Sequence, residues 1–283
     1  MGDMATPSET HGGLPGRAAA WLARGLLAAV ACSSVAWGTT TFPDFVDQTR
    51  LDGAKDLILR NVPVSDAELD NLGPLLSRAV AEKDCMPAID RSAAVIRLRL
   101  AENALASGAQ VDARMGELDE AVRKSLGCAP ADPYLWLVLF WLRNIRQGLS
   151  DANFDLLRMS YRLGPNEGWI VAKRSAMALA MFDALPPDLS SDVIAEFARL
   201  VKTELYTEAI DLLKGPGWAH RDTLLAGLAA VPQRNVDILT RTMADIGYDL
   251  DRRSPAERRN WEHKSNDRLD EPARMPPEAS ARP

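Results

Sequence analysis

The sequence has little of what sheets and catalytic centres need. It contains only four tyrosines, six phenylalanines and three histidines among 283 residues. Between Pro43 and Leu250, no stretch alternates apolar and polar residues in the manner of a strand. The chain is nevertheless 47% hydrophobic, which is enough for a substantial core. These features predict an all-α protein.

The motifs of the common enzyme classes are also missing, since the sequence contains no HExxH, GxSxG, P-loop, GxGxxG or paired CxxC pattern. His220 is the single histidine in the predicted helical region. A lone histidine without a positioned nucleophile has no reaction to serve, so we interpret His220 as a helix-cap or surface residue. We expect a protein that is not an enzyme and binds no cofactor.

Acidic residues in one predicted helix could supply a glycosidase pair, which needs two carboxylates across a cleft. Acidic and basic residues alternate there at neighbouring-turn spacings: Arg114, Glu117, Asp119, Glu120, Arg123 and Lys124. This spacing favours a solvated, salt-bridged helix face.

Two kinds of ligand are not expected. The net charge is -6, whereas a nucleic-acid-binding protein usually has an excess of basic residues. Cys85 and Cys128 have no second cysteine or histidine at ligand spacing, so no metal site is predicted.

The most informative segment is an uncharged run near the N-terminus. Nineteen residues without charge lie between Arg24 and Asp44, about the number that crosses a hydrocarbon core. Arginines precede the run and aspartates follow it. By the positive-inside rule, the N-terminus lies in the cytoplasm and the chain after Phe45 lies on the periplasmic side. We expect residues 17–42 to be a signal anchor or signal peptide that meets the membrane through residues 18–38.

Alternatives for this segment remain open. Ala36 and Gly38 form a small-x-small pattern, so a cleaved signal peptide and a soluble periplasmic product are possible outcomes. A lipoprotein box ending at Cys32 fits poorly, because Ala29 stands where a larger aliphatic residue is usual. A third interpretation is an amphipathic helix buried in the core.

Two cysteines in the exported part suggest a disulfide. Cys85 and Cys128 each lie just before a proline at the end of a predicted helix. If helices cover roughly residues 67–84, 88–107 and 111–127, the first and third point the same way. Their cysteine-bearing ends then lie on the same side, which favours a disulfide in an oxidising compartment. Two buried free thiols are the alternative.

The rest of the chain predicts one helical domain, residues 45–250, between a disordered N-terminus, residues 1–16, and a disordered tail, residues 251–283. Short helices follow one another through Gly- or Pro-containing connections, as in antiparallel helix stacks. Ser65 and Glu68 have the spacing of a capping box, and Pro74 is expected to kink or divide its helix.

One later helix is apolar on all sides. Nine apolar or aromatic residues run from Tyr134 to Leu142. They are too few to span a bilayer, so we expect a central core helix.

The surroundings of this helix resemble a tetratricopeptide repeat. Trp136 and Leu139 match the first helix of that signature, and Ala152 lies sixteen residues after Trp136, as the second helix requires. Trp169 begins the next unit 33 residues after Trp136. Phe140 departs from the signature, because a small residue is expected there. The resemblance implies antiparallel helix pairs stacked in a right-handed solenoid.

Three stretches, "CAPADPYLWLVLFWL", "YRLGPNEGW" and "LYTEAIDLLKGPGW", also resemble a group of proteobacterial envelope proteins associated with exopolysaccharide or O-antigen machinery. The resemblance covers roughly residues 85–250. It implies an accessory role in polysaccharide assembly or export, with protein partners in the envelope.

Aromatic residues near the helix junctions are the candidate binding residues: Trp136, Trp169, Trp218 and Tyr206. Their faces suit contacts with a partner side chain or a sugar ring. The alternative is that they fill interhelical layers. We therefore expect a non-enzymatic envelope scaffold. A glycan-acting enzyme would instead show two acids 5 to 10 Å apart in a deep cleft, and a self-associating module would show an exposed apolar patch.

Overall fold

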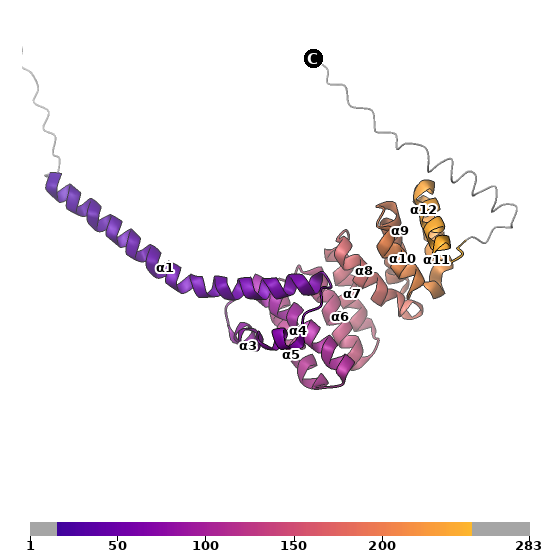
Figure 1. The fold of residues 1–283 in the computed structure, drawn as a ribbon, viewed down its shortest axis with the longest axis horizontal. Coiled ribbons are helices and arrows are strands. Elements are labelled where there is room, and N and C mark those ends of the chain that lie inside the picture. The colour runs from indigo at the N-terminus through magenta and orange to yellow at the C-terminus, as the bar shows by residue number, and fades with distance from the viewer. Residues whose placement is uncertain (1–15, 251–283) are drawn as a thin grey trace, which may run out of the picture. The chain divides into compact units, whose positions relative to one another are not determined.

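The computed structural model describes residues 16–250 (Figure 1). Almost all of the predicted N-terminal segment 1–16 and the whole predicted tail 251–283 lie outside this range. Within it, the regular elements are twelve α-helices and three short 3₁₀ helices, without a strand. The prediction of an all-α protein is confirmed. The chain divides after Lys124 into two compact units, described separately below.

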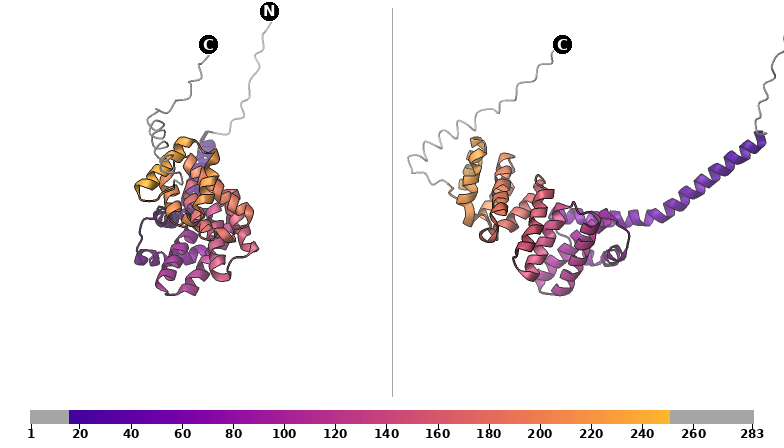
Figure 2. Two further views of the ribbon diagram at one scale, coloured as in Figure 1. Left: turned by 90° about the vertical axis from the view of Figure 1, so that its right-hand side faces the viewer. Right: turned by 180° about the vertical axis from the view of Figure 1, so that it is seen from behind.

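Unit 1 begins with α1 (Gly16–Leu59), a helix of 44 residues. Its N-terminal half stands clear of the other helices of the unit in the right-hand view of Figure 2. The predicted anchor, residues 17–42, and the start of the predicted helical domain at residue 45 belong to one helix, because α1 continues through Pro43. A proline removes one hydrogen bond from a helix interior. The C-terminal half of α1 is held by packing, because Leu51 and Ile58 are buried.

The other helices of unit 1 are α2 (Asp66–Asp70), α3 (Gly73–Ala81), α4 (Pro87–Ser107) and α5 (Val111–Cys128), whose last turn crosses into unit 2. The predicted capping box is present, because the Ser65 amide donates to Glu68 Oε2 at 3.0 Å and the Glu68 amide donates to Ser65 Oγ at 3.3 Å. Pro74 lies in the first turn of α3 and so divides α2 from α3.

Unit 2 consists of short helices with brief connections, as predicted. They are α6 (Pro133–Gln147), α7 (Asp151–Leu163), α8 (Gly168–Leu179), η1 (Phe182–Ala184), α9 (Pro187–Lys202), α10 (Tyr206–Lys214), η2 (Trp218–His220), α11 (Arg221–Ala226), η3 (Gly227–Ala230) and α12 (Gln233–Asp245). The helices α6 and α7 form the most extensive helix pair of this unit.

The predicted core helix is α6. Asp132 caps it, because its carboxylate accepts hydrogen bonds from the amides of Tyr134 and Leu135 at 2.9 and 3.2 Å. Most residues of its apolar run are buried, with Phe140 and Leu142 fully inaccessible. The two tryptophans of the run are only half-buried.

The predicted disulfide is present: Cys85 and Cys128 are both disulfide-bonded, while Cys32 is a free, exposed cysteine. Cys128 is the last residue of α5. The alternative of two buried free thiols is wrong.

Candidate functional site

The apolar run of α1 is a surface rather than a core. Trp21, Val35 and Trp37 are 70%, 67% and 71% exposed. The helix is long and apolar enough to cross a membrane, and none of its most apolar window is buried in the chain. The interpretation of this segment as a buried amphipathic helix is therefore wrong.

The hydroxyl groups of this run donate hydrogen bonds to backbone carbonyl groups of the same helix. Ser33, Ser34, Thr39, Thr40 and Thr41 each donate to a carbonyl oxygen three or four residues earlier, at 2.8 to 2.9 Å. In lipid, an unsatisfied polar group costs several kcal/mol. Internal acceptors remove that cost, so the modest hydropathy of the run is compatible with a hydrocarbon environment.

Two of the predicted binding residues stabilise local structure. The indole nitrogen of Trp136 donates to the carbonyl oxygen of Pro130 at 2.7 Å. The ring of Trp218 meets Tyr248 edge-on, with centroids 4.9 Å apart, and the guanidinium of Arg221 lies 4.8 Å from its centroid. Both tryptophans therefore contact other residues of unit 2.

Tyr206 begins α10 and is half-buried. Its hydroxyl is inaccessible to solvent and has no hydrogen-bond partner among residues 16–250. Burial raises the pKa of this hydroxyl, and the carboxylate of Glu204 adds to the shift. Tyr206 stays neutral at physiological pH.

Trp169 differs from the other three because 42% of its surface is exposed. One side of the indole is fixed against the buried ring of Tyr134, with centroids 5.1 Å apart and planes tilted by 53°. The ammonium of Lys173 lies 5.6 Å from the same tyrosine ring. The indole of Trp169 is thus fixed by its contact with Tyr134 and remains partly accessible to solvent.

A cavity of about 110 Å³ adjoins the start of α8 in unit 2. Its lining combines the α7–α8 junction with α8, α9 and the start of α10: Pro165, Asn166, Gly168, Val171, Glu196, Arg199, Leu200, Thr203 and Leu205. Leu205 is 37% exposed, and a Cβ at Gly168 would lie 3.6 Å from its methyl group. We call this cavity, with Leu205 and the neighbouring Trp169, the α8 surface.

An ion pair lies beneath the α8 surface. Arg174 and Glu196 are fully buried and joined through both carboxylate oxygens, one of them also accepting from Ser175 Oγ at 2.7 Å. The guanidinium also donates to the carbonyl oxygens of Ser160 and Gly164 at 2.7 and 2.9 Å. One cluster therefore joins α7, the α7–α8 junction, α8 and α9.

The ring of Tyr161 completes the cluster, with its centroid 4.2 Å from the guanidinium of Arg174. Burial, assisted by the charge of Glu196, raises the pKa of the Tyr161 hydroxyl well above its usual value. Gly164 is needed at the junction, because a Cβ there would lie 2.7 Å from the ring of Pro133.

Sequence reasoning missed this cluster, although one local signal existed. Arg174 follows Ile170 and Val171 by four and three residues, so it lies on the buried face of α8. Its partner Glu196 is 22 residues away.

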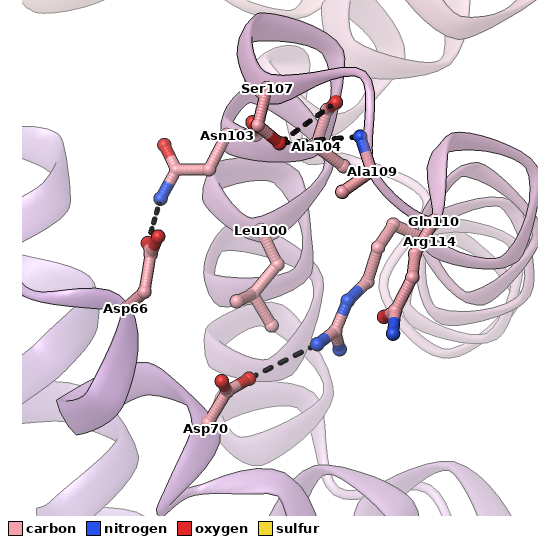
Figure 3. Close-up of a pocket in the computed structure, with 9 residues that line it drawn as sticks. All are labelled: Asp66, Asp70, Leu100, Asn103, Ala104, Ser107, Ala109, Gln110 and Arg114. Carbon is pink, nitrogen blue, oxygen red and sulfur yellow. Dashed lines mark hydrogen bonds and ion pairs between the residues drawn. The ribbon is translucent and has the colours of Figure 1, made fainter.

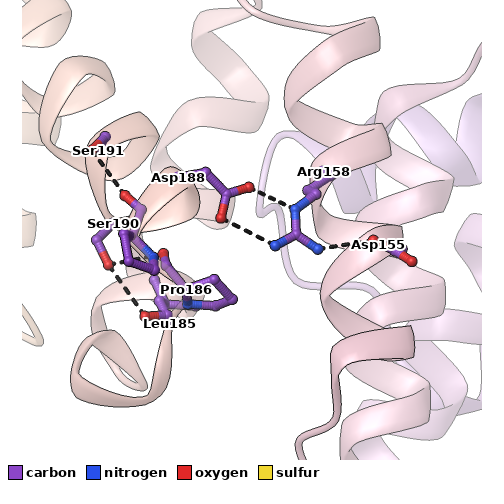
Figure 4. Close-up of polar contacts among 8 residues, drawn as sticks. Asp155, Arg158, Leu185, Pro186, Asp188, Ser190 and Ser191 are labelled. Atoms are coloured by element: carbon purple, nitrogen blue, oxygen red, sulfur yellow. Dashed lines mark hydrogen bonds and ion pairs between the residues drawn. The ribbon is translucent and has the colours of Figure 1, made fainter.

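A second ion pair joins α7 and α9 at the surface (Figure 4). Arg158 binds both carboxylate oxygens of Asp188, at 2.6 and 3.1 Å, and Asp155 at 2.8 Å. The hydrogen bonds from Arg158 are the main reason that the pKa of Asp188 is lowered.

The polar groups considered for catalysis make structural contacts. Glu117 pairs with Arg97 at 2.7 Å and Asp119 with Arg123 at 2.9 Å. The imidazole of His220 packs against the ring of Phe182, with centroids 4.7 Å apart and planes tilted by 39°. The described residues contain no group of three or more His, Cys, Asp or Glu placed to hold a metal ion.

A polar cavity of about 130 Å³ lies in unit 1 between α2, α4 and α5 (Figure 3). Its charged groups already have partners: Asp66 accepts from Asn103 at 2.6 Å, and Arg114 donates to Asp70 at 3.1 Å. These pairs hold α2 against α4 and α5.

Comparison with known proteins finds no match among protein-family models, curated proteins or solved structures.

Proposed function

We propose that the protein is a non-enzymatic scaffold anchored in the cytoplasmic membrane, with its N-terminus in the cytoplasm and its helical units on the periplasmic side. There it assists polysaccharide assembly or export through protein–protein contacts. The observation that carries the proposal is α1, an exposed apolar helix continuous with the core of unit 1. The disulfide agrees with an oxidising compartment.

An anchor is favoured over a cleaved signal peptide. Proteolysis prefers exposed, irregular chain, whereas Ala36 and Gly38 lie inside the continuous helix α1. We therefore propose that the anchor remains attached to the periplasmic part.

The helices of unit 2 are proposed to be stacked as tetratricopeptide-like pairs in a right-handed solenoid. Trp136 and Trp169 both lie in the first turn of a helix, α6 and α8, and each of these helices is followed by a partner that packs on it, α7 and α9. A stack of this kind acts by presenting helical faces to partners.

The α8 surface is the proposed contact region. It combines an exposed, well-held tryptophan with an exposed leucine, which are features of protein contact sites. Its cavity of about 110 Å³ is small beside the roughly 300–1,000 Å³ of small-molecule sites. A partner side chain is therefore a better occupant than a glycan.

Replacing Val35 by Arg tests the anchor. Val35 lies near the middle of the uncharged run, where an arginine costs roughly 2.5–3.5 kcal/mol on insertion. We expect Val35→Arg to be largely extracted from membranes by alkaline carbonate, whereas Val35→Leu stays in the pellet. Equal retention of the two variants would contradict a spanning role.

Replacing Trp169 and Leu205 tests the α8 surface. We expect Trp169→Ala with Leu205→Ser to lower surface polysaccharide at least fivefold in the cell that encodes the protein, as far as deletion of the gene does. Because both side chains are partly exposed, the melting temperature should change little. The control is Ile246→Ser, a similarly exposed apolar residue in unit 2, which should keep wild-type polysaccharide. Normal polysaccharide in the double variant would contradict the proposal.

A further inference from the structure

The direction of α1 orients unit 1 relative to the bilayer that α1 is proposed to span. The uncharged run ends at Pro43, and an α-helix rises about 1.5 Å per residue. Measured along the axis of α1, Asp47 therefore lies only about 6 Å beyond the run, while Leu59, at the end of α1, lies about 24 Å beyond it.

The helix α4 runs parallel to α1. Met86 and Ile89, at the start of α4, line a small cavity together with Asp47 and Leu51. Further along both helices, Ser92 Oγ donates to Asp52 Oδ1 at 2.7 Å. The start of α4 is thus near the end of the unit that adjoins the uncharged run of α1, and Ser107 lies about 30 Å farther along the axis of α4.

The helix α3 runs back toward that end. Arg78, in its last turn, pairs with Asp47 at 2.6 Å, and its side chain remains 67% exposed. The chain then passes through Glu82, whose carbonyl accepts from Lys124 Nζ at 2.7 Å. Residues 82–85 are all exposed, and the acidic Glu82 and Asp84 flank Lys83 in this stretch. We call Arg78 and residues 82–85 the membrane-end surface.

The height of this surface matches the lipid headgroups. A bilayer about 40–45 Å thick with a core of about 30 Å leaves roughly 5–8 Å of headgroup layer on each side. Asp47, and with it Arg78, lies about 6 Å beyond the uncharged run. Guanidinium and ammonium groups bind phosphate oxygens through charge-assisted hydrogen bonds.

We propose that the membrane-end surface contacts the headgroup layer of the same bilayer, with Arg78 and Lys83 binding lipid phosphates. This contact rests on the proposed membrane span of α1. It holds unit 1 upright, with the polar cavity at Asp66 and Ser107 facing away from the bilayer.

The test uses the full-length chain in phospholipid nanodiscs. A fluorescent non-natural amino acid is placed at Asp84, at Ser107 or at Val35, and quenching by spin-labelled lipids is measured. With headgroup-labelled lipid, we expect quenching at Asp84 to exceed quenching at Ser107 at least threefold. Equal quenching at these positions, with strong quenching of Val35 by chain-labelled lipid, overturns the contact and leaves the membrane span intact. Absence of quenching at Val35 overturns the span, and the contact falls with it.

Phosphate binding is separated from proximity by a charge change. We expect Arg78→Gln with Lys83→Gln to lower quenching at Asp84 at least twofold, because the unit then tilts away from the lipid. Arg60→Gln, an exposed arginine just beyond the far end of α1, is the matched control and should have no effect. Unchanged quenching in the double variant overturns the role of the two basic residues.

Discussion

Replacing Arg174 by Met is expected to destabilise the protein by about 3–5 kcal/mol, as removal of one partner of a buried ion pair does. The substitution leaves the Glu196 carboxylate fully buried without its cation. It also removes the donors that serve the carbonyl oxygens of Ser160 and Gly164. Urea unfolding of the full chain in detergent measures the loss.

A second variant separates the loss of the ion pair from the cost of burying one unpaired charge. Arg174→Met combined with Glu196→Leu removes both charges, so we expect it to be more stable than Arg174→Met alone. Arg158→Gln breaks the exposed pair with Asp188 between the same two helices (Figure 4) and should shift the unfolding midpoint far less. Equal losses in Arg174→Met and Arg158→Gln would contradict a special role for the buried cluster.

Removal of the disulfide should have a comparable effect. Cys85 and Cys128 close a loop of 43 residues, and the chain-entropy model gives about 4 kcal/mol for a loop of that length. We therefore expect Cys85→Ser to unfold at much lower urea concentration than the oxidised protein, and reductant to shift the wild type in the same direction.

The free cysteine supplies the control for this experiment. Cys32→Ser should leave the urea midpoint unchanged, because Cys32 is exposed on α1 and forms no disulfide. A midpoint for Cys85→Ser equal to that of the wild type would show that the disulfide does not constrain the unfolded chain.

Features that depend on neighbouring residues were predictable from the sequence. The Ser65–Glu68 capping box and the division at Pro74 follow from local hydrogen bonding and from the missing amide of proline. The length of the uncharged run in α1 alone was enough to predict a segment that could span a membrane. The disulfide was predicted because two helix ends at similar heights place Cys85 and Cys128 together.

Features that depend on packing were less predictable. Proline usually ends a helix, and the continuation of α1 through Pro43 accompanies packing of its second half on α4, 40 residues later in the sequence. The contacts of Trp136 with Pro130 and of Trp218 with Tyr248 exist only in the folded chain, and no spacing in the sequence indicates them. No spacing rule links Arg174 to Glu196, since their contact exists only when α8 packs on α9.

Cysteine labelling in intact cells shows whether the helical units lie outside the cytoplasm, as the proposed membrane anchor requires. Cells are quenched in acid, denatured, and treated with a maleimide mass tag with or without reductant. We expect Cys85 and Cys128 to gain tags only after reduction, and Cys85→Ser to leave Cys128 open to the tag without reductant. Tagging of both cysteines in the wild type without reductant would contradict the proposed location, because the pair would then be reduced in the cell.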